Sequence, residues 1–338
     1  MYIVGYLYEK SSWNPKDEHF SDLTHLFYSF AKIKDESGSV YEEFTQAHQL
    51  KELKENHPKL KVVLSIGGWG AGYFSETAAN PSSLRTFCES TIALIETYHF
   101  DGIDLDWEYP CTSVAGIKSS RDDRVNFTNM LFELKAALHQ LSLKTKKKYV
   151  LTAAFGALMG DGHSVELDKV MSLLDFVNVM TYDLTTNGIA SHNTNLYASP
   201  RTNQIGSADY IQTFIDHGVD PSQLLLGIAF YARKQDQVVF EKDILGSKVL
   251  GNSFGSATYT KIKEELLNNP LYSYGYDEEA QAPYLFGDHE FYSYDDERSI
   301  KEKVNYVKKM GLKGVFFWQY ASDHTHTLIK AITKARQE

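Results

Sequence analysis

Short runs of β-branched, aromatic and other apolar residues recur along the whole chain, and longer segments separate them. Eight of these runs are predicted strands, at residues 2–8, 25–31, 61–66, 102–107, 149–155, 176–182, 224–230 and 314–318. The segments between them, such as 82–99 and 124–141, carry apolar residues three and four positions apart, as helices do. Strands that alternate with helices form parallel sheets covered by helices, and eight repeats favour an α/β fold of the closed (β/α)8 type, a TIM barrel.

The interval between the seventh predicted strand and the eighth is too long for a simple connection. We interpret residues 234–295 as a small α+β subdomain inserted on the face of the barrel where the strands end. Within it, residues 271–276 are a candidate strand and residues 259–267 a candidate helix. A length of 338 residues suits one barrel, so we expect a single catalytic domain over residues 1–338 that carries this insertion.

Charge and composition argue against several kinds of partner and cofactor. The formal net charge is -10 and the longest basic run is Lys146-Lys147-Lys148, which disfavours nucleic acid. No stretch approaches the ~18 apolar residues of a membrane-spanning helix, so no membrane partner is expected. Cys88 and Cys111 are too few for a disulfide framework. The start of the chain lacks a signal-peptide pattern, which leaves two alternatives: the protein stays inside the cell, or a signal was removed.

Three acids alternate with apolar residues along the predicted strand 102–107 and just beyond it. Because side chains alternate between the faces of a strand, Asp104, Asp106 and Glu108 share one face. Ile103, Leu105 and Trp107 share the other. A solvated face explains such a pattern in an antiparallel sheet. In a barrel, the apolar face packs on the helices and the acids point inward, toward the end where barrel active sites open.

Neighbouring acids in this row lie roughly 6–7 Å apart, so three ionised carboxylates would repel one another in a partly dry site. At least one of them should therefore hold a proton near neutral pH. A raised pKa of this kind is what a general acid needs. Glu108 is last in the row and nearest the open end of the barrel, so we predict that Glu108 is the acid.

The acidic segment resembles the D-x-x-D-x-D-x-E signature of glycoside hydrolase family 18, matched by Asp101, Asp104, Asp106 and Glu108. Further matches follow along almost the whole chain: Ser65-Ile66-Gly67-Gly68-Trp69 (S-x-G-G), Met180-Thr181-Tyr182-Asp183 (M-x-Y-D), Tyr231-Ala232-Arg233 (Y-x-R) and Trp318 at the end of the last strand. Ala232 stands where glycine is common. The resemblance implies a chitinase, an enzyme that hydrolyses β-1,4 bonds between N-acetylglucosamine units.

By this resemblance, the substrate supplies its own nucleophile. The 2-acetamido oxygen attacks the anomeric carbon while Glu108 protonates the glycosidic oxygen, and water opens the oxazolinium ion with retention. Asp106 is expected to orient the acetamido group, and Asp104 to share a proton with Asp106. Tyr182 would donate a hydrogen bond to the acetamido oxygen, and Asp183 would contact the sugar. No cofactor and no metal are expected.

The resemblance also implies a set of substrate-binding residues: Trp318, Trp69, Arg233, Tyr231, Met180, Tyr6, Phe30 and Trp13. Trp318 would form the platform under the reacting sugar, and Trp69 would stack on the sugar beyond the scissile bond. For Phe30 and Met180, simple packing in the barrel core is an equally good interpretation. Trp13, in the loop after the first strand, is a candidate for a more distant subsite. Ser65 is expected to support a buried acid, and Asp101 to fix a junction at the strand.

Three alternatives stay open beside the chitinase. An endo-β-N-acetylglucosaminidase shares the barrel and the acetamido chemistry, and a non-catalytic chitin-binding lectin shares the barrel but usually lacks the acid. A metal-dependent hydrolase would use the three acids as hard ligands. The expected partners are chitin or N-acetylglucosamine oligosaccharides, the expected state is a monomer, and family resemblance implies secretion. Only a helix-like tail follows Trp318, so no separate chitin-binding module is expected there.

Overall fold

The computed structural model describes residues 1–251 and 254–338. Eight parallel strands close into a barrel, since β1 pairs with both β2 and β16. In spatial order they are β1 (Tyr2–Tyr8), β16 (Gly314–Trp318), β8 (Leu224–Ala229), β7 (Phe176–Met180), β6 (Val150–Gly156), β5 (Gly102–Asp106), β4 (Lys61–Gly67) and β2 (His25–Ile33). The short β3 (Val40–Tyr41) pairs antiparallel with the end of β2. The eight predicted strands and the barrel are thus confirmed, with ends that differ by at most two residues.

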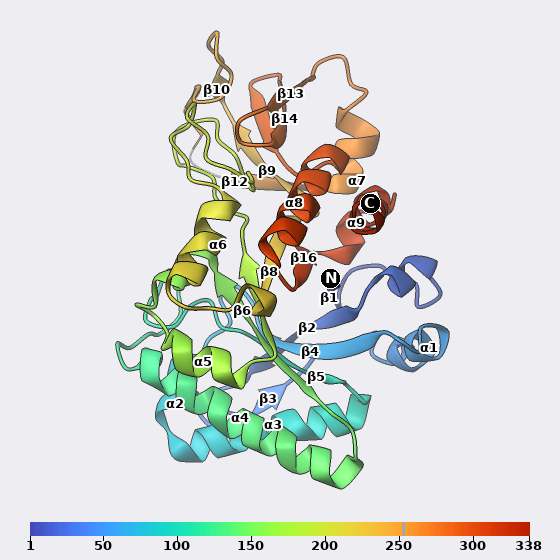
Figure 1. Ribbon diagram of the computed structural model, residues 1–338, viewed down its shortest axis with the longest axis vertical. Helices are drawn as coiled ribbons and strands as arrows, with labels where there is room; N and C mark the ends of the chain where they lie inside the picture. Colours follow the sequence, from blue (N-terminus) through green and yellow to red (C-terminus); the bar gives the residue numbers. More distant parts are fainter. Residues whose placement is uncertain (252–253) are drawn as a thin grey trace.

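Helices surround this barrel (Figure 1). They are α1 (Gln49–Asn56), α2 (Phe74–Ala79), α3 (Pro81–Tyr98), α4 (Asp123–Thr145), α5 (Leu167–Leu173), α6 (Ser207–Asp216), α8 (Glu297–Met310) and α9 (Thr327–Gln337). The start of α3 follows from its sequence, because the Asn80 side chain accepts hydrogen bonds from the backbone N–H groups of Ser82 and Ser83. Pro81 occupies the first helical position, where its missing N–H costs nothing.

The acidic strand β5 is oriented as its alternation predicts. Ile103 and Leu105 are fully buried among the apolar residues between strands and helices. Trp107, just after the strand, is also buried, and its ring stacks on Phe74 of α2 with centroids 5.4 Å apart. Since the apolar face packs on the helices, the acids Asp104 and Asp106 point into the barrel.

The interval between β8 and β16 folds as a five-stranded antiparallel sheet with helical segments, at the top of Figure 1. In order across the sheet its strands are β12 (Phe254–Thr258), β9 (Tyr231–Asp236), β15 (Glu290–Ser293), β14 (Ala282–Gly287) and β13 (Ser273–Asp277). A separate hairpin pairs β10 (Val238–Val239) with β11 (Lys248–Val249). The candidate helix appears as α7 (Tyr259–Lys261), which continues as a π-helix over Ile262–Leu266.

The insertion begins earlier than the predicted boundary at residue 234. Only Phe230 separates β8 from β9, so the chain passes directly from the barrel into the inserted sheet. Tyr231 and Arg233 therefore lie on the first inserted strand. The interpretation of the whole chain as one catalytic domain stays a prediction.

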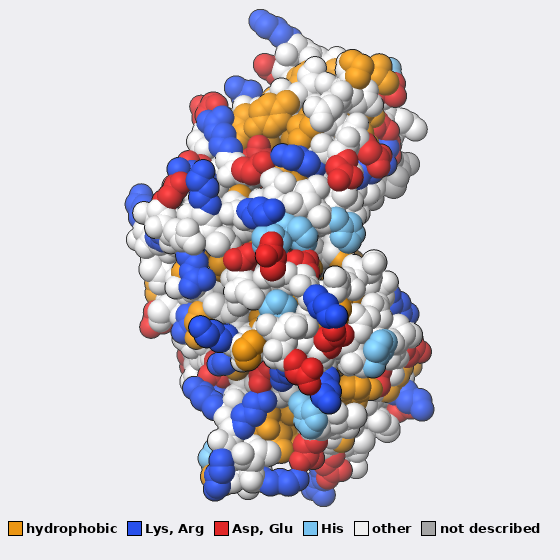
Figure 2. Space-filling view, turned by 90° about the vertical axis from the view of Figure 1, so that its right-hand side faces the viewer, with side chains coloured by type: hydrophobic (Ala, Val, Ile, Leu, Met, Phe, Trp, Pro, Cys, Tyr) orange, Lys and Arg blue, Asp and Glu red, His pale blue; other side chains and the backbone are white. Residues whose placement is uncertain are grey.

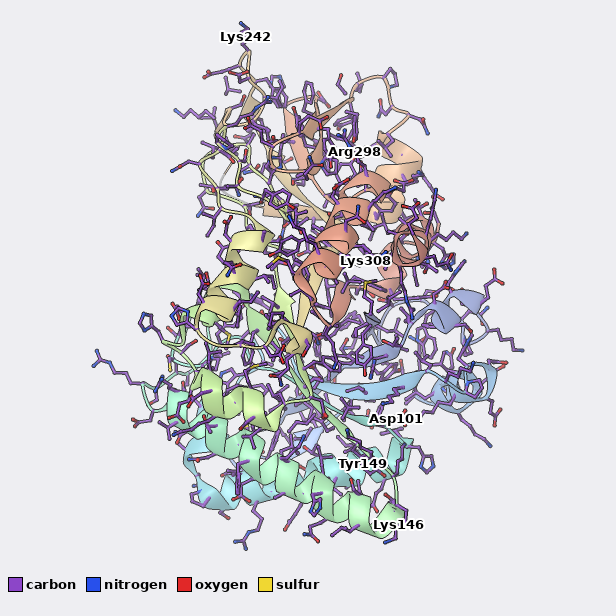
Figure 3. The ribbon with its side chains drawn as sticks, viewed as in Figure 1. Asp101, Lys146, Tyr149, Lys242, Arg298 and Lys308 are labelled. Carbon is purple, nitrogen blue, oxygen red and sulfur yellow. The ribbon has the colours of Figure 1, made fainter. Side chains whose placement is uncertain are left out.

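Asp101 lies at the opposite end of β5 from the predicted catalytic residues (Figure 3). Its carboxylate contacts Lys147 Nζ at 2.6 Å and Lys54 Nζ at 2.8 Å, and it accepts a hydrogen bond from the Val62 backbone N–H. Asp101 thus joins β5 to its neighbours, as expected for a residue that fixes a junction.

Basic and acidic side chains are interspersed over the face shown in Figure 2. Within residues 1–251 and 254–338, no helix is both long enough and apolar enough to cross a bilayer.

The closeness of β5 and β6 makes a prediction about stability. A Cβ on Gly102 would lie 2.2 Å from the Val150 carbonyl oxygen, so Gly102→Ala forces two barrel strands apart. We expect the free energy of unfolding, measured with urea, to fall by about 1–3 kcal/mol. Gly72→Ala is the control, because a Cβ there meets no atom of the described residues within 4 Å. Equal stability of the two variants would contradict this account of the barrel.

Candidate active site

Asp104 is the most deeply buried acid of the row, with an exposed fraction of 0%. Its carboxylate accepts three hydrogen bonds of 2.8 Å, from the hydroxyl groups of Tyr6, Ser65 and Thr152. Burial raises the pKa of Asp104 to about 6, although the three hydrogen bonds favour the ionised form and oppose this rise. Ser65 therefore supports a buried acid, as the sequence predicts.

Asp106 and Glu108 continue the row toward the open end of the barrel. Burial raises the pKa of Asp106 well above its usual range, and the charges of Glu108 and Asp104 raise it further. Glu108 follows the end of β5, and burial raises its pKa to about 7 against the opposing hydrogen bond from Tyr109. The structure thus brings the three acids together in a site where ionising all of them is unfavourable.

Tyr182 and Asp183 follow the end of β7 and face these acids. The Tyr182 ring lies 6.0 Å from the Tyr231 ring, and burial raises the pKa of its hydroxyl well above the usual range, so the hydroxyl stays protonated. Nearby charges, including that of Asp106, add to this rise. A neutral hydroxyl beside a carboxylate row is a hydrogen-bond donor for a bound polar group.

The Asp183 carboxylate is held from the inserted sheet. Arg233 contacts both of its oxygens, through Nε and Nη2, at 2.6 Å each, and the Tyr231 hydroxyl donates a third hydrogen bond at 2.6 Å. This planar two-point contact fixes the carboxylate in one orientation. The three residues that sequence analysis assigned separately to the substrate therefore form one unit.

The Tyr6 hydroxyl contacts the buried acid directly. It donates to Asp104 and accepts a hydrogen bond of 3.1 Å from Asn178 Nδ2. Its ring lies 5.9 Å from that of Trp318. Tyr6 therefore connects the buried acid to the aromatic surface above it.

An aromatic surface lies at the ends of β16, β2 and β4. The Phe30 ring stacks on Trp318 with centroids 5.5 Å apart and planes 15° apart. Trp69 is 64% exposed, and its ring lies 6.4 Å from that of Tyr109. A cavity of about 290 Å³ lies against Phe30, Trp69 and Trp318. Exposed aromatic faces beside a cavity can stack on the apolar faces of sugar rings.

Two further predicted contact residues, Met180 and Trp13, pack against aromatic neighbours. Met180 is buried, with an exposed fraction of 8%, and packs inside the barrel with Tyr6. Trp13 packs edge-on against Phe20 and Tyr28, with centroids 6.0 Å and 6.1 Å away, and it lines a separate cavity of about 200 Å³. The structure does not bring Trp13 to the carboxylate row, and a distant subsite for it stays a prediction.

Three further members of the site, Thr152, Asn178 and Tyr109, were not predicted from the sequence. Thr152 and Asn178 are each a fully buried polar residue in an otherwise apolar strand, β6 or β7. A buried polar side chain needs a hydrogen-bond partner, so a single polar residue in such a run was the available signal. In the part of the chain that the structure describes, no group of three or more His, Cys, Asp or Glu side chains is arranged to hold a metal ion.

The chain is similar in sequence to proteins of known family. The profile of glycosyl hydrolases family 18 matches residues 2–323. Chitinase A1 of Niallia circulans is 33% identical over 83% of this chain and 43% of its own length, and chitotriosidase-1 of Mus musculus is 31% identical over 90% of this chain and 68% of its own length. The chain thus spans less than half of the first of these relatives.

Solved structures agree with the sequence relatives. A family 18 N-acetylglucosaminidase from Paenibacillus barengoltzii is 35% identical with a TM-score of 0.93, over 99% of this chain and 100% of that chain. A class V chitinase from Nicotiana tobaccum is 25% identical with a TM-score of 0.89, over 99% of this chain and 98% of that chain. The family profile, the relatives and the barrel agree with the motifs in β4, β5, β7 and β16. The chain belongs to family 18 of the glycosyl hydrolases.

Proposed function

We propose that this protein is a chitinase that hydrolyses β-1,4 bonds between N-acetylglucosamine units with retention, and that Glu108 is its general acid and base. The observation that carries the proposal is the row Asp104, Asp106 and Glu108, with Glu108 at the open end and its pKa raised to about 7. A carboxyl group with this pKa is substantially protonated near neutral pH and can give its proton to a leaving oxygen. The names of the relatives, Chitinase A1 and chitotriosidase-1, support the choice of substrate.

The remaining acids suit the acetamido-assisted form of the reaction. Asp106 lies between Asp104 and Glu108, and its charge interacts with both. Neighbouring carboxyl groups that are buried do not all ionise, so Asp104 and Asp106 share a proton. As positive charge develops on the oxazolinium ion, the shared proton is held by Asp104, so that Asp106 is ionised, stabilises the ion and orients the acetamido nitrogen.

Tyr182 supplies the complementary contact. Its hydroxyl stays protonated, so it donates a hydrogen bond to the acetamido oxygen that attacks the anomeric carbon. The Asp183 carboxylate, held by Arg233 and Tyr231, presents a fixed acceptor to the sugar from the same side. An N-acetylated sugar is therefore required in the reacting subsite.

The aromatic surface provides the stacking contacts of the proposal. Trp318, backed by Phe30, is the platform for the reacting sugar, and the exposed Trp69 stacks on the sugar beyond the scissile bond. Met180 and Tyr6 form the wall beneath the acetamido group. A mutant form of the class V chitinase from Nicotiana tobaccum, 25% identical to this chain with a TM-score of 0.88, is solved in complex with NAG4.

A second candidate is an N-acetylglucosaminidase, because the Paenibacillus barengoltzii enzyme with that name matches this chain at 35% identity over the full length of that chain. The lectin alternative also has a structural neighbour, a chitinase-like agglutinin from Robinia pseudoacacia at 28% identity and a TM-score of 0.84. Glu108 in this chain favours catalysis over binding alone. The lengths of the products released from an oligomer of defined length distinguish the two hydrolase candidates.

The proposal predicts the effect of removing the acid. With a soluble N-acetylglucosamine tetramer, wild-type protein should release product that is initially the β-anomer, as read by NMR. Glu108→Gln keeps the shape of the side chain but has no proton to give, so kcat/KM should fall roughly 100-fold or more.

Glu133→Gln, on the exposed part of α4, is the control and should retain wild-type activity. An α-anomer as the first product would contradict retention. If wild type binds the tetramer without cutting it, the lectin interpretation replaces the hydrolase.

The raised pKa of Glu108 also makes a prediction about stability and pH. Folding raises the pKa of this carboxyl from 4.5 to about 7, so the folded protein binds the proton more tightly than the unfolded chain does. Its contribution to the free energy of unfolding is therefore fully present below pH 4.5 and is lost as the pH rises through 7. Gln at this position undergoes no such loss. Urea unfolding should therefore show that Glu108→Gln becomes more stable relative to wild type between pH 4 and pH 8, by up to about 3 kcal/mol. A difference that stays constant with pH would contradict the buried, protonated Glu108.

A further inference from the structure

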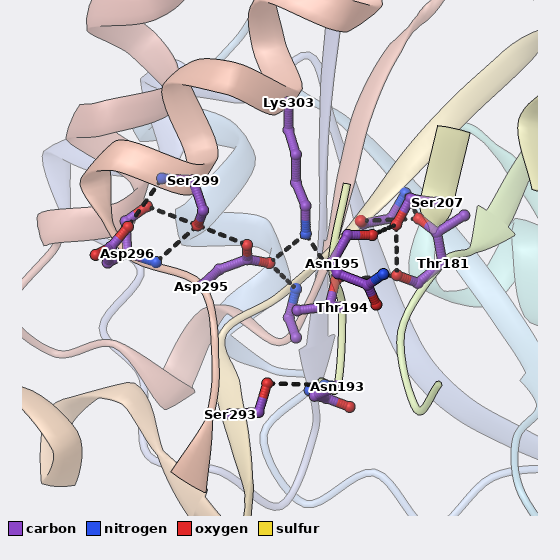
Figure 4. Close-up of polar contacts among 12 residues, drawn as sticks. Thr181, Asn193, Thr194, Asn195, Ser207, Ser293, Asp295, Asp296, Ser299 and Lys303 are labelled. Carbon is purple, nitrogen blue, oxygen red and sulfur yellow. Dashed lines mark hydrogen bonds and ion pairs between the residues drawn. The ribbon is translucent and has the colours of Figure 1, made fainter. Parts of the chain in front are cut away.

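Lys303 lies on α8 with an exposed fraction of 0%, at the centre of a buried polar network (Figure 4). Its ammonium group contacts Asp295 Oδ2 at 2.7 Å and donates a hydrogen bond to Thr194 Oγ1 at 2.6 Å. Asp295 is also fully buried, and it accepts further hydrogen bonds from the Ser299 hydroxyl and the Ala229 backbone N–H. Lys303 and Asp295 thus form a buried ion pair beside the end of β8.

The network continues from Lys303 to the end of β7. Thr194 uses its own hydroxyl proton to donate to the Thr181 carbonyl oxygen at 2.9 Å. The Ser207 hydroxyl lies 3.3 Å from the same oxygen and donates to the Asn195 carbonyl oxygen at 2.8 Å (Figure 4). Thr181 immediately precedes Tyr182, so its carbonyl belongs to the peptide group on the N-terminal side of Tyr182. This peptide group is connected to Lys303 through the Thr194 side chain alone.

The peptide group on the other side of Tyr182 is anchored by the same loop. Asn193, next to Thr194, accepts a hydrogen bond of 2.9 Å from the Asp183 backbone N–H through its Oδ1. The Asn193 backbone N–H donates in turn to the Ser293 hydroxyl of β15 at 2.7 Å. Residues 193–194 therefore hold the backbone on both sides of Tyr182.

A charged pair is a costly way to fill this space. Moving an ammonium and a carboxylate out of water is unfavourable, and apolar side chains of similar volume often give equal or greater stability. What the ion pair adds is a set of directional contacts that select one backbone arrangement. The arrangement selected here belongs to the segment that carries Tyr182 and Asp183.

We propose that Lys303 is a positioning residue for the hydrolytic reaction, acting through Thr194 on the segment from Thr181 to Asp183. It keeps the Tyr182 hydroxyl and the Asp183 carboxylate where they hold the N-acetyl sugar in the reacting geometry. The inference rests on the proposed function. Lys303 thereby acts from α8, the helix that follows the insertion, without contacting the substrate.

Two variants test this connection. Lys303→Met removes the ammonium group, and Thr194→Val removes only the hydroxyl that links Lys303 to Thr181 and leaves the ion pair in place. Lys308→Met is the control on the same helix, where the ammonium group contacts the Ala335 carbonyl oxygen instead (Figure 3). For each folded variant, kcat and KM on the N-acetylglucosamine tetramer are measured, together with hydrogen exchange of the Asp183 amide.

We expect kcat to fall roughly 10- to 100-fold in both test variants, because small displacements of positioned groups cost that much, while KM changes about twofold at most. Since the two changes break the same connection, the double variant should be about as slow as Lys303→Met alone. The Asp183 amide should exchange about tenfold faster or more in both test variants. Lys308→Met should match wild type in all three measurements.

Wild-type kcat in folded Thr194→Val would overturn the inference and leave the proposed function standing. Losses that multiply in the double variant would also overturn it. If Lys303→Met does not fold, Thr194→Val alone decides the outcome. If wild type does not cut the tetramer, the proposed function fails. In that case, hydrogen exchange of the Asp183 amide tests the positioning role separately. An unchanged exchange rate in Thr194→Val overturns the positioning role, and faster exchange supports it.

Discussion

The burial of the Asp104 carboxyl group inside the barrel is the constraint on which the rest of the site depends. A carboxyl with no exposed surface is tolerable only when its oxygens have partners, and Tyr6, Ser65 and Thr152 supply them from three other strands. These contacts join β1, β4, β5 and β6. With this position held by short hydrogen bonds, Asp106 and Glu108 have fixed places above it. Burial, together with the charges of neighbouring carboxylates, raises their pKa values and keeps protons in the site at neutral pH.

Much of this arrangement could be predicted from the sequence, because it follows from local periodicity. The alternation around β5 predicts which face carries the acids, and the burial of Ile103, Leu105 and Trp107 on the other face confirms it. The eight strands were predictable for the same reason. Local patterns are less informative at strand ends. Three strands end before the predicted residue: β5 at Asp106, β7 at Met180 and β8 at Ala229, where residues 107, 182 and 230 were predicted.

The parts that could not be predicted depend on contacts between residues far apart in the chain. Asp183 and Arg233 were each predicted to contact the sugar. In the structure they form a two-point contact with each other, and Tyr231 donates a third hydrogen bond to Asp183. Thr152 and Asn178 were not predicted because no local pattern indicates which acid or hydroxyl a buried polar side chain will contact. The boundary of the insertion was placed too late because β9 follows β8 with no turn signal between them.

The insertion is therefore part of the site and is more than a decoration of the barrel. Its first strand provides Arg233 and Tyr231, and β15 provides Ser293, which holds Asn193 beside the Asp183 backbone. The helix that follows it carries Lys303. Asp183 is thus held on its side chain and on its backbone by residues that are in place only when the inserted sheet is folded against the barrel. The geometry of the segment with Tyr182 and Asp183 is in this way coupled to folding of the insertion, while the hydrogen bonds that hold Asp104 come from barrel strands.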